Sequence, residues 1–104
     1  MAQVVWTTPA VEQLQEIVAY VAQYSIDRAE KLNERLLTTA DRLELFPQSG
    51  RVVPEFGLEH LRELIVRPYR ILYTCQEENC AIVAVIHSSR DLTRLLKPED
   101  FDDA

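Results

Sequence analysis

LRELIVRPYRILYTCQEENCAIVAVIH, residues 61–87, is the stretch of sequence that decides the fold. Branched and aromatic side chains dominate three segments of it, 61–66, 69–76 and 80–87, and this composition is typical of β-strands. Short polar or proline-containing connections separate the segments, as in tight turns. The last segment is apolar almost without interruption, which is the pattern of a strand buried on both faces. The stretch therefore predicts a three-stranded antiparallel meander.

Two amphipathic helices are predicted before the meander. The apolar stripe of the first consists of Ala10, Leu14, Ile17, Val18 and Val21, and that of the second of Ala29, Leu32, Leu36, Ala40 and Leu43. The first helix is expected to begin at Thr8, whose side chain can cap it, with Pro9 in its first position. Ser25 or Asp27 is expected to cap the second helix, and Asp27 with Glu30 resembles a capping box. Two such helices form an antiparallel hairpin whose shared apolar face packs on a sheet.

The remaining segments complete one small domain. Residues 2–6 are predicted to form a short strand, and the prolines and glycines between residues 47 and 57 indicate a loop. The predicted fold class is α+β with the order β-α-α-β-β-β, a helical hairpin on one face of a small, mainly antiparallel sheet. We expect residues 1–104 to form a single domain, with 95–104 as a frayed acidic tail.

The second face of the sheet needs a cover of its own. One helical hairpin covers one face, and the segment after Arg90 is the only other covering material in the chain. Either this segment or another protein must therefore cover the second face. In the latter case the isolated protein would expose a large apolar patch, and would dimerise, aggregate or require its partner.

The charge of the chain is uneven. The net charge of −6 and the pI near 4.8 argue against nucleic acid as a partner. Residues 51–94 nevertheless carry six arginines and no lysine, and the planar guanidinium suits interfaces with carboxylates or phosphates. Strand alternation places Arg70 opposite the expected core residues Ile71 and Tyr73, on the concave face. There Arg70 either binds an anion or pairs with Glu63 or Asp91.

The two cysteines and the N-terminal sequence indicate which cellular compartment and which cofactors to expect. Cys75 and Cys80 flank a predicted turn, so that their thiols are expected to face each other, although a disulfide is not expected in a reducing cytoplasm. A zinc site would need two further ligands beside them, so we expect no metal and no other cofactor. Neither a membrane span nor a signal sequence is visible, which predicts a cytoplasmic protein without a membrane partner.

Four stretches, taken in order, resemble one known family. They are Trp6-Thr7-Thr8-Pro9-Ala10, Phe46-Pro47-Gln48-Ser49-Gly50-Arg51 with Pro54-Glu55, Arg62-Glu63-Leu64-Ile65-Val66 leading into Tyr69-Arg70-Ile71-Leu72-Tyr73, and Val85-Ile86-His87 with Arg90-Asp91. Over residues 4 to 92 the chain resembles the RelE/ParE family of bacterial type II toxins. The resemblance implies a RelE-like fold and a growth-arresting toxin that a cognate, ParD-like antitoxin neutralises. It also implies a toxin–antitoxin hetero-oligomer or a homodimer.

The family has two branches, ribosome-dependent mRNA endoribonucleases and toxins that inhibit DNA gyrase. RNA cleavage needs a base, an acid and cations that stabilise the charged transition state. For this branch the resemblance implies catalytic roles for Arg70 and Arg90, with the ribosome and mRNA as partners. His87, at the end of the last strand, is either the base or acid of that reaction near neutral pH or a strand-end residue hydrogen-bonded to the backbone. Ribonuclease members carry lysines on the strand before Arg70, whereas this chain has Glu63 there and no lysine. The C-terminal segment also offers Leu95, Leu96 and Lys97 in place of an aromatic residue or histidine.

These departures and the acidic balance favour the ParE-like branch. That branch requires no catalytic side chain, because gyrase is inhibited by binding. We therefore predict a gyrase inhibitor, with Arg51, Arg62, Arg70 and Arg90 as a polar interaction surface and with the antitoxin on the apolar second face of the sheet. No individual antitoxin-binding residue follows from the sequence. A degenerate member that is no longer toxic and acts only as a binding module is a further alternative.

Overall fold

The structure is a computed structural model that describes residues 1–97 and residue 99. Its elements are β1 (Gln3–Trp6), α1 (Thr8–Ala22), α2 (Ile26–Asp41), the 3-10 helix η1 (Arg42–Glu44), β2 (Arg51–Val52), β3 (Leu61–Val66), β4 (Tyr69–Gln76), β5 (Asn79–His87) and α3 (Leu92–Leu95). The strands form one sheet in the order β1-β5-β4-β3-β2, in which β1 is parallel to β5 and all other pairs are antiparallel. The predicted α+β order and the meander are confirmed.

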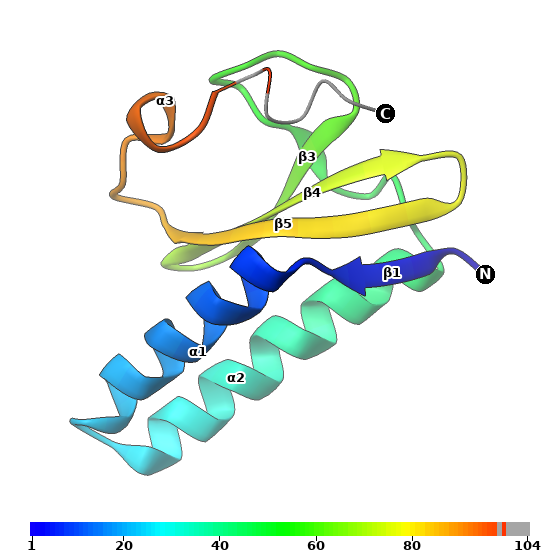
Figure 1. Ribbon diagram of the computed structural model, residues 1–104. Helices are drawn as coiled ribbons and strands as arrows, with labels where there is room; N and C mark the ends of the chain where they lie inside the picture. The colour runs from blue at the N-terminus through cyan, green and yellow to red at the C-terminus, as the bar shows by residue number, and fades with distance from the viewer. Residues whose placement is uncertain (98, 100–104) are drawn as a thin grey trace.

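The helical hairpin packs on one face of the sheet, as predicted (Figure 1). The main core between them contains Ala10, Leu14, Leu36, Ala40, Leu43, Val66, Ile71, Tyr73, Cys80, Ile82 and Val85. The core therefore contains five of the predicted stripe residues, with Ile17, Val18 and Leu32 packed against them, and Tyr73 is the largest fully buried side chain. One face of β4 and β5 thus packs on the helices, and their other face is turned away from them.

The beginnings of the two helices differ from the expectation. Thr7, and not Thr8, is the N-cap of α1, and its hydroxyl donates to the Ile82 carbonyl at 2.8 Å instead of capping the helix. Ser25 caps α2, because its hydroxyl accepts the Arg28 N–H at 3.1 Å. The proposed Asp27–Glu30 capping box is wrong, because Ser25 is the N-cap and Asp27 lies within the first turn, where its carboxylate is 3.0 Å from the Lys31 ammonium.

Strand β2 was expected to be loop. Its two residues pair with Arg62 and Glu63 of β3, and a segment this short between Gly50 and Pro54 carries no strand periodicity. The pairing fixes the loop that follows, residues 53–60, above the second face of the sheet, opposite α1 and α2 (Figure 1).

The chain itself covers the second face. A second cluster consists of Val53, Leu61, Leu72, Ala84, Ile86 and Leu92, with Phe56, Leu58, Val83 and Leu96 packed against it. The cover thus comes from the loop after β2 and from the segment around α3. The expectation of an apolar, antitoxin-binding patch is wrong for this part of β5, where Ala84 and Ile86 are buried. Within the predicted tail, Leu96 packs against this cluster, and residues 98 and 100–104 lie outside the described residues.

The two cysteines face each other as predicted. Cys75 and Cys80 are directly paired across β4 and β5, both are free thiols, and their sulfurs lie 2.8 Å apart. Burial raises the pKa of the Cys80 thiol to about 12. Among the described residues no cluster of three or more His, Cys, Asp or Glu side chains is arranged to hold a metal. The helices of this part of the chain are too short or too polar to cross a membrane.

Candidate functional site

An arginine–glutamate cluster lies on the second face of the sheet, and it consists of Arg51, Glu55, Glu63 and Arg70. Arg51 of β2 is paired with Glu63 of β3, and Arg70 of β4 is paired with Ile65, two residues further along β3. Side chains two residues apart on a strand share a face, so these registers bring the three together. Glu55 reaches the cluster from the loop after β2.

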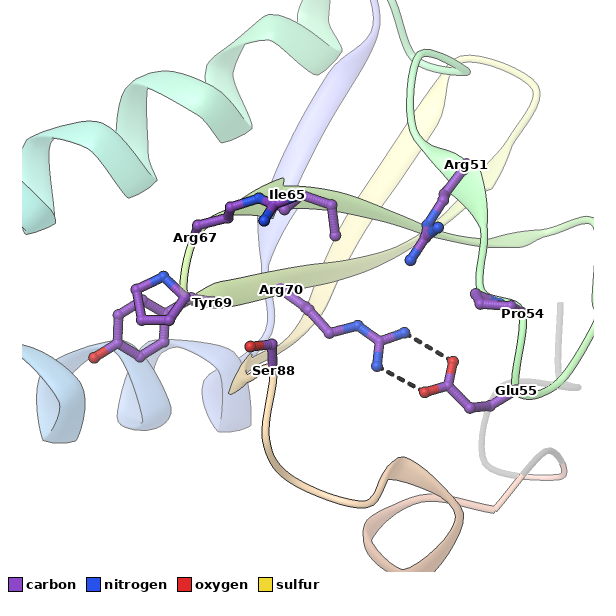
Figure 2. Close-up of a pocket in the computed structure, with 9 residues that line it drawn as sticks. Arg51, Pro54, Glu55, Ile65, Arg67, Tyr69, Arg70 and Ser88 are labelled. Carbon is purple, nitrogen blue, oxygen red and sulfur yellow. Dashed lines mark hydrogen bonds and ion pairs between the residues drawn. The ribbon is translucent and has the colours of Figure 1, made fainter.

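Arg70 is bonded through all three of its guanidinium nitrogens. Its Nε donates to Oε1 of Glu63, while Nη1 and Nη2 donate to the two oxygens of Glu55 at 2.7 and 2.8 Å (Figure 2). The second oxygen of Glu63 accepts from Nε of Arg51. The contact with Glu55 is the bidentate fork that makes arginine–carboxylate pairs strong and directional. Arg70 lies on the face of β4 opposite Ile71 and Tyr73, as alternation predicts, and of the two carboxylates named as alternative partners it pairs with Glu63.

The four side chains of the cluster differ in how far they are exposed to solvent. The side chain of Glu63 is fully buried, that of Arg70 is 8% exposed, that of Glu55 is 29% exposed and that of Arg51 is 62% exposed. The hydrogen bonds from Arg70 lower the pKa of Glu55, and the same bonds raise the pKa of Arg70. Two guanidinium groups and two carboxylates cancel in charge. The cluster is therefore an ion-pair network in which each nitrogen of the Arg70 guanidinium group is bonded to a carboxylate, and these bonds use three of its five N–H donors.

A pocket of about 440 Å³ opens beside the cluster. It is lined by Arg51, Pro54, Glu55, Ile65, Arg67, Pro68, Tyr69, Arg70 and Ser88 (Figure 2). Arg51 and Arg67 are exposed there, whereas Arg70 points toward Glu55. Any ligand of this pocket would therefore meet the exposed arginines first.

Arg62 lies on the other face of β3, toward the helices. Its Nη1 donates to the Gly50 carbonyl at 3.0 Å, and the Tyr73 hydroxyl accepts the Gly50 N–H at 2.9 Å. A Cβ at position 50 would lie 2.6 Å from the Glu63 carbonyl and 2.7 Å from the Tyr73 ring, so only glycine fits. Arg62 therefore anchors the chain before β2. Because neighbouring strand residues alternate in face, it does not share a surface with Arg51 and Arg70.

His87 and Arg90 lie in a different pocket from Arg70. Both line a hollow of about 340 Å³ between α1 and the end of β5, with Gln13, Glu16, Ile17, Val85, Ile86, Leu95 and Leu96. Nδ1 of His87 lies 3.1 Å from the Ser89 amide and 2.8 Å from its hydroxyl, and the ring packs edge-on against Tyr69. The three residues of the ribonuclease alternative thus line two separate pockets.

Glu55 is the member of the cluster that sequence reasoning missed. Asp91, named as a partner for Arg70, instead accepts hydrogen bonds from the Thr93 amide and hydroxyl and caps α3. The Pro54-Glu55 dipeptide belongs to one of the four stretches that resemble the family, but the position of a loop carboxylate above a strand depends on tertiary folding. A charged residue next to proline in the loop was the available signal.

Comparison with known proteins identifies the family. The sequence model described as "ParE toxin of type II toxin-antitoxin system, parDE" matches residues 4–92. The chain belongs to this toxin family. It is 40% identical over 91 residues to "Toxin RelE2" of Caulobacter vibrioides, covering 86% of this chain and 99% of that protein. It is also 31% identical over 93 residues to "Putative toxin Y4kP" of Sinorhizobium fredii, with 88% and 93% covered.

A solved structure shows the same fold. The toxin chain is similar to a chain of the "Chromosomal ParDE TA system from P. aeruginosa", with a TM-score of 0.69 at 19% sequence identity. The alignment covers 84% of this chain and 96% of that one. The predicted RelE/ParE resemblance is therefore confirmed, and the protein is a toxin of the type II toxin–antitoxin class.

Proposed function

We propose that this toxin arrests growth by binding DNA gyrase, that it does not cleave RNA, and that a cognate antitoxin neutralises it. The choice of gyrase over mRNA as the target rests on one observation, that the guanidinium group of Arg70 is hydrogen-bonded to Glu55 and Glu63. Arg70 is the residue on which the ribonuclease alternative depends most.

A catalytic cation must be free to contact the charge that develops in the transition state. To bind a phosphate, Arg70 would have to release Glu55 and would still lie beside the buried carboxylate of Glu63. Two carboxylates at this site repel a phosphate, and the repulsion is strongest where water is excluded. These charges support a structural role for Arg70 and disfavour mRNA as a substrate.

The second candidate is RelE-like, ribosome-dependent mRNA cleavage. Its one favourable observation is that His87 and Arg90 line the same pocket. A general base must lie within about 3 Å of the proton that it removes, and the cation must contact the same substrate. His87 is paired with Tyr69 across β4 and β5 and packs its ring against the Tyr69 ring, so it lies on the face of the sheet opposite Arg70, which weighs against this candidate.

The antitoxin is supported by the family. The matching family is described as part of a toxin–antitoxin system, and the similar solved structure is described as a ParDE system. We infer a ParD-like antitoxin for this toxin, acting in the cytoplasm. Neutralisation requires only that the two proteins bind tightly, so no cofactor enters the mechanism.

Induced expression in a bacterial host tests the proposal. Labelled thymidine and labelled methionine are followed after induction, and we expect DNA synthesis to stop before protein synthesis. Co-expression of the antitoxin should restore growth, and His87→Ala should remain toxic. An earlier stop in protein synthesis together with cut mRNA would favour the ribonuclease branch, and unaffected growth would favour a non-toxic binding module.

A further inference from the structure

The two cysteines of the chain lie directly opposite each other, beside the turn that joins β4 and β5. Cys75 is paired with Cys80, one position before the pair that closes the hairpin. The Cys75 N–H donates to the His60 carbonyl at 3.2 Å, so the backbone polar groups of Cys75 point away from β5. In a non-hydrogen-bonded pair of this kind the opposite Cα atoms are about 4.5 Å apart and the side chains are closest. A disulfide needs Cα atoms about 4.4–6.8 Å apart, so the pair can be bridged without movement of the backbone.

A β-bulge sets the register that pairs the two cysteines. The pairing of β4 with β5 shifts by one residue at this bulge, where Val83 is the additional residue of β5. In the register on the other side of the bulge, Cys75 would be paired with Ala81, and the two thiols would lie on opposite faces of the sheet. The bulge therefore brings both thiols onto one face, where their sulfurs are 2.8 Å apart.

The two thiols differ in their access to solvent. Cys80 is 2% exposed and belongs to the main core, whereas Cys75 is half-buried at the margin of that core. Burial raises the pKa of the Cys80 thiol to about 12, so this thiol stays protonated at neutral pH. A small oxidant that arrives from solvent therefore meets Cys75 first and finds the second thiol directly beside it.

We propose that Cys75 and Cys80 form a reversible oxidation site, which hydrogen peroxide converts from a dithiol to a disulfide. The Cys75 thiolate attacks one oxygen of the peroxide, the O–O bond breaks, and the products are Cys75 sulfenic acid and hydroxide, which is protonated to water. The Cys80 sulfur then attacks the Cys75 sulfur and the S–O bond breaks. The departing hydroxide takes the Cys80 proton and leaves as a second water. The two thiols lose two electrons, and the peroxide gains them.

The disulfide cross-links the end of the hairpin at the centre of the sheet. Strand β5 is paired with β4 on one side and with β1 on the other, where Cys80 is opposite Val4. A disulfide stabilises mainly by restricting the unfolded chain, and a short loop such as this one gives a modest effect. Arg70 lies on the other face of β4, so oxidation leaves the arginine–glutamate cluster in place. Oxidation thus makes the toxin more resistant to unfolding, whichever target it binds.

The resting form is the dithiol. Cytoplasmic thiols such as glutathione keep cysteines reduced, and the disulfides that form there are mostly transient and redox-sensing. Reduced glutathione restores the two thiols by exchange through a mixed disulfide. The site therefore responds to peroxide and returns to the dithiol when the peroxide has been consumed.

The test treats the reduced, full-length toxin with a small molar excess of hydrogen peroxide and counts free thiols by alkylation and mass spectrometry. We expect two alkylated thiols before treatment and none after it, with a protein mass lower by about 2 Da. Digestion after Glu77 or Glu78 separates the cysteines, so their two peptides should stay joined until a reductant is added. The urea midpoint should rise by about 1 M on oxidation, and excess reduced glutathione should restore both the thiols and the original midpoint.

Two variants separate the roles of the thiols. Cys75→Ser keeps only the buried thiol, so peroxide should change neither its thiol count nor its urea midpoint. Cys80→Ala keeps only the more exposed thiol, and its sulfenic acid should persist and be trapped by dimedone.

The other outcomes contradict the proposal. Sulfinic acid on Cys75 with a free Cys80 thiol would overturn it, as would disulfides between two toxin molecules. A joined pair that glutathione does not reduce would overturn the reversibility, and an unchanged or lower urea midpoint would overturn the stabilising effect. Equal oxidation of Cys75→Ser and the wild type would overturn the order of the two steps.

Discussion

Replacing Arg70 by Ala should destabilise the fold strongly. The substitution removes the cation between Glu55 and Glu63 and leaves the fully buried carboxylate of Glu63 with Arg51 alone, whose side chain is 62% exposed. It also removes the buried stem of Arg70 from the second face of the sheet. We therefore expect Arg70→Ala to lower the stability of the fold itself, whatever its effect on toxicity.

The magnitude follows from the charge separation. A hydrogen-bonded arginine–carboxylate pair has charge centres about 4 Å apart, which attract by about 4 kcal/mol at an effective dielectric constant of about 20. Removal of one partner of a buried pair destabilises by about 3–5 kcal/mol, because the other charge stays buried without compensation. We expect a decrease in the free energy of unfolding within this range.

Urea denaturation at neutral pH, followed by circular dichroism, measures the effect. With a slope of about 1.5 kcal/mol per molar urea, the midpoint should fall by about 2–3 M. Arg90→Ala is the control, because Arg90 is exposed and makes no ion pair with the described residues, and it should change the stability by less than about 0.5 kcal/mol.

The double variant Glu63→Leu/Arg70→Met keeps the test informative if Arg70→Ala fails to fold. It replaces both buried charges by apolar side chains of similar volume, and we expect it to recover most of the stability. A loss below about 1 kcal/mol for Arg70→Ala, with an unchanged slope, would refute the structural role of the cluster.

Three further predictions concern acid stability, the Gly50 anchor and the thiols. The folded state lowers the pKa of Glu55 through its bonds to Arg70, so its contribution is present above the ordinary carboxyl pKa and is lost as pH falls through the lowered value. Urea midpoints measured below about pH 4.5 should therefore fall less in Glu55→Gln than in the wild type, and equal acid sensitivity would contradict this. Tyr73→Phe leaves the Gly50 N–H without its buried acceptor and should lower the stability by about 1–3 kcal/mol, measured by thermal unfolding; an unchanged melting temperature would speak against the anchor. Iodoacetamide at pH 8 should alkylate Cys75 faster than the buried Cys80, whose pKa is raised to about 12, and peptide mass spectrometry would show equal rates if burial were irrelevant.

Local periodicity explains why most of the fold could be predicted. The stripes of α1 and α2 and the alternation around Arg70 depend on neighbours in sequence, and the structure places these residues as expected. Strand β2 could not be predicted, since its two residues become a strand only through pairing with β3. The cover of the second face was likewise undetermined, because loop residues such as Phe56 and Leu58 show no period.

The candidate site was predicted only in part for the same reason. Alternation requires Arg62 and Glu63 to lie on opposite faces of β3, but it does not say which face meets the helices. The pairing of Arg70 with Glu55 depends on the position to which the loop after β2 returns above β4, which no local pattern in the sequence determines.

The choice of target is tested most directly by gyrase itself. Purified toxin is added to a supercoiling reaction with relaxed plasmid, and in parallel to a translation reaction that contains a reporter mRNA. At micromolar toxin we expect supercoiling to stop and the translated mRNA to stay intact. Unaffected supercoiling together with cleavage of the translated mRNA would contradict gyrase binding and would place this toxin in the ribonuclease branch.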